Sequence, residues 1–395
     1  MSSQPLHPSR RRRLGKAARR VGALAAPLVF ATLGGCVFMP RTLEPGAEAP
    51  VVAAPNPQAP RLTPLETRHF DLPSASEDVV GETQVIFARY ENTFAAIARQ
   101  YDLGYDELGL ANPGVDRWLP GEGTPIYLPT ETVLPDTPRV GIVINVPAMR
   151  LYYFEEDRAS GAVRVTSHPI GIGAEGWETP TGEAKVTQKA RDPVWYVPAS
   201  VRKEHASHGD ALPRIVQPGP DNPLGKFALA LSLPGYLIHG TNKPSGVGMR
   251  VSHGCIRLYP EDIAELFEQV PKGTPVRLVN QPVVAGWRDG QLYLEVHPPL
   301  AEDERDVAVE ADSVLHRAIE RAGATAVNVD SARVAQIIAE RRGIPFPVLR
   351  AARAPEQYLA GSRVVENTVP IERAADAGQT PATALSGVGA GTTAR

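Results

Sequence analysis

Two short apolar runs on either side of a proline constrain the fold most strongly. Residues 140–146 and 149–154 are rich in β-branched and aromatic side chains, and Pro147 and Ala148 stand between them. Such a pair of runs around a turn predicts a β-hairpin. Similar runs predict further strands at 162–172, 183–188, 227–232, 236–239 and 275–280. Together they predict a mainly β domain over residues 139–281, with one helix at 261–269 between Pro260 and Pro271.

The segment 236–258 passes through polar residues and glycine, and it holds Cys255. The other cysteine of the chain is Cys36, near the N-terminus. A thiol attacks only as thiolate, and at its ordinary pKa of about 8.5 a few per cent is ionised near pH 7. An isolated cysteine is usually a buried and inert residue. The surroundings of Cys255 suit a loop instead, and they indicate a nucleophile that needs a nearby base.

His239 and His253 precede Cys255 and are candidates for that base. His239 ends an apolar run, so a strand can hold its ring while it takes the thiol proton and later returns a proton to a leaving amine. His253 could assist the thiolate or stabilise an oxyanion. Gly254 permits positive φ, and the backbone amides of Gly254 and Cys255 are candidate oxyanion donors.

Three more residues near the thiol are candidate substrate contacts. Thr241 and Ser252 lie beside the two histidines in sequence. Arg257 could bind a substrate carboxylate, because a guanidinium group matches the geometry of a carboxylate. A structural salt bridge is the alternative role for Arg257.

The motifs around Cys255 resemble those of the YkuD-type L,D-transpeptidases, which remodel bacterial peptidoglycan. The resemblance rests on the strings His239-Gly240-Thr241, Ser252-His253-Gly254-Cys255, Gly171-Ile172-Gly173, Thr179-Pro180-Thr181-Gly182 and Trp195-Tyr196-Val197-Pro198. Arg257 stands where many members have Asn, which matches the ErfK/YbiS/YcfS/YnhG-like branch, whose exported enzymes join a lipoprotein to the wall and carry an N-terminal LysM module. The resemblance implies a β-sandwich or barrel-like catalytic domain and a backbone carbonyl near Gly240 that orients His239.

The resemblance also implies a two-step acyl transfer. Cys255 attacks the carbonyl that joins the L-centre of diaminopimelate to the terminal D-Ala of a tetrapeptide stem, D-Ala leaves, and an amine then attacks the thioester. A stem amine gives a 3–3 cross-link, a lysine of an outer-membrane lipoprotein anchors the wall, and water gives hydrolysis. Residues 241–250 are a candidate loop that excludes water. A thiol hydrolase, acting as an L,D-carboxypeptidase or detaching lipoprotein, and a non-catalytic wall-binding lipoprotein stay open as alternatives.

No metal or organic cofactor is expected. His205 and His208 have metal-ligand spacing but lack a credible third ligand. A zinc site at the thiol and its two histidines would need a separate base, and no Glu lies close to the motif in sequence. His168, like His205 and His208, is expected to be an ordinary core or surface histidine.

Residues 1–36 predict an exported lipoprotein. Seven basic residues precede a short apolar run at 21–35, as in a signal peptide, and that run is too short for a typical transmembrane helix. The string Leu33-Gly34-Gly35-Cys36 resembles a bacterial lipobox, which implies lipidation of Cys36 and a membrane tether in the periplasm of a Gram-negative bacterium. An ordinary secretory signal is the alternative. Without the signal the chain has 34 basic and 44 acidic residues, a net charge of −10, which argues against nucleic-acid binding.

Residues 37–78 are rich in proline and alanine and predict an extended linker. Residues 79–130 predict a strand, two helices and a strand, the first helix capped by Asn92 or Thr93. This order and the strings Thr93-Phe94-Ala95-Ala96-Ile97-Ala98, Ala111-Asn112-Pro113 and Ile126-Tyr127-Leu128-Pro129 resemble a LysM module. The resemblance implies binding to glycan chains that contain N-acetylglucosamine, with a packing domain lacking sugar affinity as the alternative.

The C-terminal part predicts a helical subdomain followed by a tail. Residues 286–350 predict a strand pair near 286–299 and two amphipathic helices, at 305–322 and 330–342, the second capped by Asp330 or Ser331. Residues 354–395 become rich in alanine, glycine and threonine, which predicts disorder.

Overall fold

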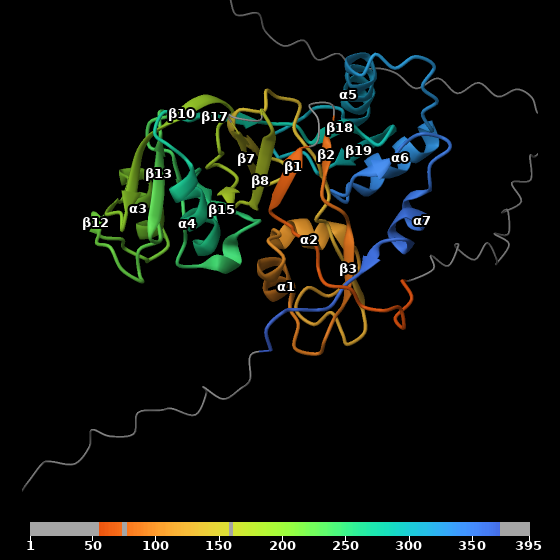
Figure 1. The fold of residues 1–395 in the computed structure, drawn as a ribbon. Coiled ribbons are helices and arrows are strands. Elements are labelled where there is room, and N and C mark those ends of the chain that lie inside the picture. Colours follow the sequence, from red (N-terminus) through yellow and green to blue (C-terminus); the bar gives the residue numbers. More distant parts are fainter. Residues whose placement is uncertain (1–54, 73–76, 158–160, 372–395) are drawn as a thin grey trace, which may run out of the picture. The chain divides into compact units, whose positions relative to one another are not determined.

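The predicted hairpin lies in the middle of the largest sheet. In this computed structural model, which describes residues 55–72, 77–157 and 161–371, β6 (Gly141–Asn145) and β7 (Arg150–Glu156) pair antiparallel. The described residues belong to one compact unit (Figure 1). The predicted signal segment and Cys36 lie outside the described residues.

Nine strands form this sheet, in the order β1-β8-β7-β6-β17-β10-β13-β14-β16. Their bounds, apart from β6 and β7, are β1 His69–Leu72, β8 Val163–Pro169, β17 Pro275–Val279, β10 Gly182–Arg191, β13 Phe227–Leu231, β14 Leu237–His239 and β16 Ile256–Arg257. The pairs β6–β17 and β14–β16 are parallel, and the other pairs in the sheet are antiparallel. The predicted β-rich domain is thus confirmed as a large mixed sheet within a mixed α/β fold.

One helix covers the apolar side of this sheet. Helix α4 (Pro260–Gln269) begins with Pro260 at its first turn, as predicted, and buries Ile263, Leu266 and Phe267. Proline suits this position because its missing N–H would have no intrahelical partner. These side chains join a core of strand residues that includes Ile142, Ile144, Leu151, Ile238 and Ile256.

The N-terminal module has the predicted order of elements. Strand β3 (Gln84–Phe87) precedes α1 (Phe94–Gln100) and α2 (Tyr105–Ala111), and β4 (Pro125–Leu128) pairs antiparallel with β3. Thr93 caps α1 by accepting the Ala96 amide, at 3.2 Å. Phe94, Ile97, Leu108 and Ile126 are among the residues of the module's own core.

The predicted linker is wrong for its last residues. β1 pairs antiparallel with β8 at the edge of the large sheet, and β2 (Val79–Val80) pairs with β5 (Thr132–Val133). Phe70 and Leu72 contact an apolar cluster that includes Val165, so two apolar side chains in a polar stretch are enough to bring the chain to the sheet edge.

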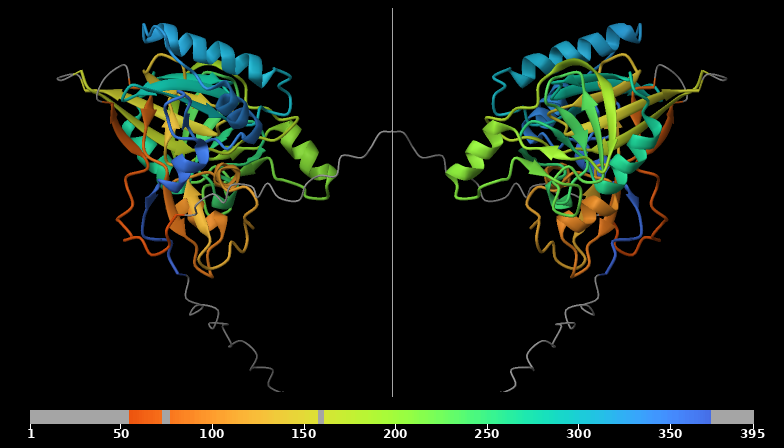
Figure 2. Two further views of the ribbon diagram at one scale, coloured as in Figure 1. Left: turned by 90° about the vertical axis from the view of Figure 1, so that its right-hand side faces the viewer. Right: turned by 90° about the vertical axis from the view of Figure 1, so that its left-hand side faces the viewer.

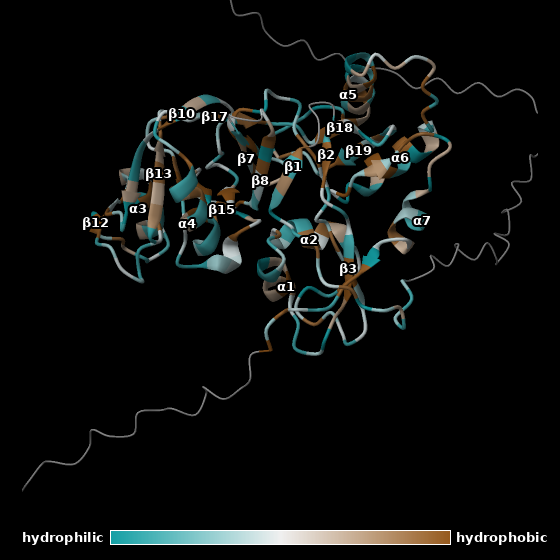
Figure 3. Cartoon of the chain, viewed as in Figure 1, coloured by the Kyte–Doolittle hydropathy of each residue, from teal (hydrophilic) through white to brown (hydrophobic). Residues whose placement is uncertain are grey.

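The strand pair and the two helices expected after residue 286 are present. Strands β18 (Val283–Arg288), β19 (Gln291–Val296) and β20 (Phe346–Pro347) form one sheet, and helix α5 (Val307–Arg321) lies against β18 (Figure 2). Helix α5 mixes hydrophilic and hydrophobic residues (Figure 3), and its buried positions include Val314 and Leu315. Helix α6 (Ser331–Glu340) is capped by Asp330, which accepts the Arg333 amide.

The predicted disorder from residue 354 is wrong as far as residue 371. Helix α7 (Pro355–Ala360) follows the subdomain, and β21 (Arg363–Val364) pairs in parallel with β3 of the N-terminal module. Val365 and Val369 are buried in the module's core, and the Tyr101 hydroxyl donates to the Glu366 carbonyl at 2.9 Å. Composition alone does not reveal these contacts. Residues 372–395 lie outside the described part of the chain.

The remaining elements are short. They are α3 (Ala199–Ser207), the 3-10 turn η1 (Pro244–Gly246), β9 (Ile172–Gly173), β11 (Trp195–Tyr196), β12 (Ile215–Val216) and β15 (Arg250–Ser252). None of the helices in the described ranges combines the length and the hydropathy of a membrane-spanning segment.

A buried arginine joins the N-terminal module to the large sheet. Arg150 of β7 donates to Glu107 of α2 at 2.7 Å, to Ser167 at 2.7 Å and to the carbonyl of Asp102 at 3.0 Å. Glu107 also accepts the Gly104 amide at 2.8 Å. Since both charged side chains are buried, each depends on the other for its charge compensation.

We expect Glu107→Gln to lower the free energy of unfolding by about 3–5 kcal/mol, because the Arg150 charge would stay buried without its counter-ion. Urea unfolding followed by circular dichroism measures the loss. The matched control is Arg164→Gln, which breaks the exposed Arg164–Asp71 pair and should cost less than about 1 kcal/mol. Equal losses in the two variants would contradict a connecting role for the buried pair.

Candidate active site

The parallel pairing of β14 and β16 brings the predicted catalytic residues together. Ile238 is paired with Ile256, and both side chains are buried in the core. Successive side chains of a strand point to opposite faces, so His239, Cys255 and Arg257 share the other face. His239 and Arg257 are direct partners in the register, and Cys255 comes immediately before β16.

Cys255 is a free, partly exposed thiol whose Sγ lies 3.7 Å from the carbonyl oxygen of Gly235. Burial raises the pKa of this thiol, while a hydrogen bond from the Leu237 amide and the charge of Arg257 offset part of the rise. The resting group near pH 7 is therefore the neutral thiol, which needs a base when it reacts.

His239 is buried and has the form of a neutral base. Its Nδ1 lies 2.6 Å from the carbonyl oxygen of Gly240, and because a carbonyl only accepts, Nδ1 carries the proton. The Gly240 carbonyl thus orients the ring, as the resemblance implies, and leaves Nε2 unprotonated. Burial, with a smaller contribution from Arg257, lowers the pKa of His239 to about 4.

Gly254 holds the turn before the nucleophile in a conformation that disfavours a side chain. Its φ is 97°, and a Cβ there would lie 2.9 Å from Cε1 of Tyr236 and 3.3 Å from the carbonyl oxygen of Glu178. The Gly254 carbonyl accepts a hydrogen bond from the Thr179 hydroxyl at 2.9 Å. The segment that begins at Thr179, which is part of the family resemblance, therefore contacts the turn before Cys255. Replacement of Gly254 would therefore displace the backbone next to Cys255.

The hydroxyls of Ser252 and Thr241 are buried and have partners within the chain. Ser252 donates to the Cys255 carbonyl at 2.6 Å and accepts the Gly254 amide at 3.2 Å. Thr241 accepts the Lys243 amide at 2.9 Å. Both residues thus support the backbone of the turns that flank the site, and the Gly254 amide already has an acceptor.

Arg257 presents an uncompensated charge to the site. Its Nε is buried without a hydrogen-bond partner, and within the described ranges no carboxylate lies within 4.0 Å of its guanidinium nitrogens. Arg257 therefore does not form the structural salt bridge that was its alternative role. A half-buried guanidinium beside a nucleophile is suited to a substrate anion.

His253 is held by residues that the sequence did not indicate. Its Nε2 lies 2.5 Å from Oε2 of Glu204 on α3, and Trp177 packs edge-on against its ring, with 4.7 Å between centroids. The ring of His205 lies 5.7 Å away and bonds to Asp210. Glu204 was not predictable, because α3 is mostly polar and has a single buried residue, Val201. Glu204, His205 and His253 lie close enough together to hold a metal ion, whereas His208, whose spacing from His205 did not predict a metal site, is not part of this group.

The loop 241–250 lies against the N-terminal module. The carbonyls of Val247 and Gly248 accept the amides of Tyr105 and Asp106, at 3.3 and 3.1 Å, at the start of α2. A Cβ at Gly248 would lie 2.2 Å from Cα of Gly104. The two backbones are therefore so close that only glycine fits at position 248. The candidate covering loop is therefore supported from outside the catalytic domain.

Comparison with known proteins agrees with this geometry. Residues 139–278 match the YkuD model, described as the L,D-transpeptidase catalytic domain, and residues 284–348 match the L,D-transpeptidase C-terminal domain. The chain is 39% identical over 301 residues to the probable L,D-transpeptidase YcfS of Escherichia coli, covering 74% of this chain and 92% of that protein. The chain belongs to the L,D-transpeptidase family. It is an enzyme of the group that contains ErfK, YbiS and YcfS.

Two other relatives show the same extent of similarity. The chain is 40% identical over 283 residues to YbiS of Escherichia coli, covering 70% of this chain and 90% of that protein. It is 39% identical over 289 residues to ErfK/SrfK of Salmonella typhimurium, covering 71% and 90%. The matched models give the subdomain of β18–β20, α5 and α6 a family assignment and leave residues 79–130 unmatched, so the LysM assignment stays a prediction.

We expect alkylation of Cys255 by iodoacetamide to keep accelerating above pH 9, because burial raises the pKa of its thiol. Arg257→Gln should move the profile to still higher pH, since it removes a charge that favours the thiolate. Mass mapping of the Cys255 peptide measures the rate. Arg277→Gln, on β17 and ion-paired with Glu183, is the matched control and should leave the profile unchanged. A plateau below pH 8 in the native chain would contradict the raised pKa.

Proposed function

We propose that this enzyme acts on peptidoglycan tetrapeptide stems through a thioester at Cys255. The observation that carries the proposal is the neutral His239, whose Nδ1 is bound by Gly240 and whose side chain, by strand alternation, lies on the same face of the paired strands as the thiol. This arrangement supplies a base without a metal or an organic cofactor.

The reaction takes two steps. His239 Nε2 accepts the Cys255 proton as Sγ attacks the carbonyl between diaminopimelate and the terminal D-Ala, and the imidazolium then protonates the leaving amine of D-Ala. Because the pKa of His239 is lowered to about 4, its imidazolium is a stronger acid than an ordinary one and returns its proton readily. In the second step the acceptor amine attacks the thioester, loses its proton to His239, and releases the thiol.

The developing oxyanion lies within reach of the turn before the nucleophile. The amides of Gly254 and Cys255 are its proposed donors, and the Gly254 amide would exchange its 3.2 Å bond to Ser252 for the oxyanion. Arg257 is proposed to bind a substrate carboxylate. Thr241 and Ser252 are proposed to support this subsite through the backbone they hold.

Two acceptors fit the proposal. A diaminopimelate amine of a second stem would give a 3–3 cross-link, and a lysine of an outer-membrane lipoprotein would attach it to the wall. The support for an amine acceptor over water is the loop 241–250, which α2 holds beside the site. Muropeptides incubated with the enzyme, with and without an added amine, separate transfer from hydrolysis by product mass, and tripeptide alone in both reactions would favour the thiol hydrolase.

His239→Gln is expected to lower kcat/KM for D-Ala release by 10²- to 10⁴-fold, because the thiol loses its base. In the native enzyme kcat/KM should fall only as the pH drops through about 4, where His239 becomes protonated. The measurement is D-Ala release over pH 3–8. His316→Gln on the exposed side of α5 is the control, and an acid limb near the ordinary histidine pKa of about 6.5 would contradict the role of His239.

The N-terminal module is proposed to bind glycan. Tyr90 and Trp118 are 75% and 69% exposed, and Leu119 is exposed beside Trp118. They lie on two loops that are joined by a hydrogen bond from the Phe94 amide to the Arg117 carbonyl, at 2.8 Å. Exposed aromatic rings on adjoining loops are a suitable surface for the apolar faces of sugars.

We also propose that Cys36 is lipidated and that the enzyme is tethered to a membrane in the periplasm.

Trp118→Ala should weaken binding to N-acetylglucosamine oligomers at least tenfold, because the ring would no longer cover the sugar face. Isothermal titration with the oligomers measures the change. Tyr196→Ala removes an equally exposed ring on β11, outside the module, and is the matched control. An unchanged affinity in the Trp118 variant, or no binding by the native chain, would favour a packing module.

A further inference from the structure

Three buried side chains from different elements face one another outside the catalytic site. Asp102 follows α1, His168 lies on β8, and Asp262 lies in the first turn of α4. All three are less than 7% exposed, and their candidate ligand atoms lie within 4.8 Å of one another. His168 is a core histidine, as expected, but its ring nitrogens have no hydrogen-bond partner, so it is not an ordinary satisfied one.

The polar atoms of this cluster lack partners. In the described part of the chain, both ring nitrogens of His168, both carboxylate oxygens of Asp262 and Oδ2 of Asp102 are buried without a hydrogen bond. Buried polar groups are nearly always hydrogen-bonded, and two buried carboxylates side by side repel each other. Five buried atoms without a hydrogen bond, whose ion-pair distances to one another and to Arg68 are 3.6–3.7 Å, point to a cation between them.

We propose that Asp102, His168 and Asp262 bind a divalent transition-metal ion, with zinc as the first candidate. Nδ1 of His168 lies 3.6 Å from Oδ2 of Asp102 and 3.6 Å from Oδ1 of Asp262. Two ligands of a tetrahedral zinc ion, each about 2.0–2.2 Å from the metal, stand about 3.3–3.6 Å apart. The separations are thus too long for hydrogen bonds and close to those of a coordination shell.

The three ligands are held in place before any ion binds. Arg150 fixes the turn of Asp102 by donating to its carbonyl, and Asp102 itself has a positive φ of 55°. His168 is paired within the sheet, and Asp262 is fixed by its helix. One imidazole and two carboxylates form a donor set suited to zinc and its neighbours rather than to magnesium.

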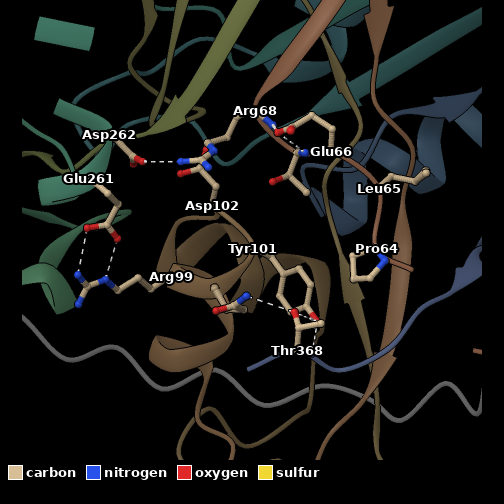
Figure 4. A pocket seen from close by; sticks show the side chains of 12 residues that line it. Pro64, Leu65, Glu66, Arg68, Arg99, Tyr101, Asp102, Glu261, Asp262 and Thr368 are labelled. Carbon is tan, nitrogen blue, oxygen red and sulfur yellow. Dashed lines mark hydrogen bonds and ion pairs between the residues drawn. The ribbon is translucent and has the colours of Figure 1, made fainter. Parts of the chain in front are cut away.

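An open cavity of ≈ 470 Å³ gives the ion access and room for a water ligand. Asp102 and Asp262 both line it, and Figure 4 shows the Asp262 carboxylate turned toward Arg68 at the cavity wall. Arg68 is at the cavity wall with Nη1 3.7 Å from Oδ1 of Asp262, so one cation already faces this carboxylate. Arg68 is partly exposed and divides its charge between Asp262 and Glu265, the latter at 3.9 Å. On the buried side, the charge of Arg150 acts on Asp102, but Arg150 is bound to Glu107 and to the Asp102 carbonyl.

The ion would connect the N-terminal module to the catalytic domain. Asp102 belongs to the module, whereas His168 and Asp262 belong to the large sheet and to the helix that covers it. Metal binding would therefore stabilise the same junction as the Arg150–Glu107 pair.

The test is metal analysis of the full chain, purified without a histidine tag, dialysed against zinc and then freed of unbound ion. We expect about one zinc per chain, and a rise in Tm of about 5 °C at a zinc concentration 100-fold above Kd. Asp262→Asn and His168→Gln should each lose the ion and the Tm shift. Metal-free Asp262→Asn should be at least as stable as the metal-free native chain, because one of two repelling charges is gone.

His205→Gln is the matched control, because it removes a ligand from the other histidine cluster, near His253, and should keep the zinc. Zinc that is lost in His205→Gln and retained in Asp262→Asn would overturn the proposal, as would a native chain without stoichiometric zinc. If Asp262→Asn does not fold, Asp102→Asn, in a turn, takes its place. None of these outcomes depends on transpeptidase activity.

Discussion

The pairing of two short strands, β14 and β16, decides how the catalytic groups meet. Ile238 and Ile256 stand opposite each other and are buried in the core, so the pairing is anchored by apolar contact. Strand alternation then places His239 and Arg257 on the other side of the sheet together with Cys255. A shift of one residue in this register would turn the thiol into the core and the isoleucines outward.

The same burial sets the chemistry of the site. It lowers the pKa of His239 and raises the pKa of Cys255, so the resting pair is neutral and no thiolate is stored. Arg257 carries a charge without a carboxylate partner among the described residues and favours the thiolate form once the reaction begins. Because the thiolate is the form that oxidants attack, a neutral resting thiol suits an enzyme proposed to work in an oxidising compartment.

Local signals in the sequence predicted local structure, and the family motif pointed to the thiol and the histidine that the fold brings to one face. The Thr93 and Asp330 caps and the proline at the start of α4 depend on neighbours in sequence, which explains their success. Strands β1 and β21 are short and pair with segments distant in sequence. Their sequences are too short to show the alternation of apolar and polar residues that predicts a strand. Glu204 beside His253, and Asp102 beside His168, come from separate elements and become neighbours only through the tertiary fold.

The protonation state of His239 is the central claim, and nitrogen-15 NMR of its imidazole tests it most directly. The structure predicts a proton on Nδ1 and an unprotonated Nε2 from pH 5 to pH 8, because Gly240 accepts from Nδ1 and burial disfavours the charged ring. An imidazolium with both nitrogens protonated near pH 7, paired with a Cys255 thiolate, would contradict the account.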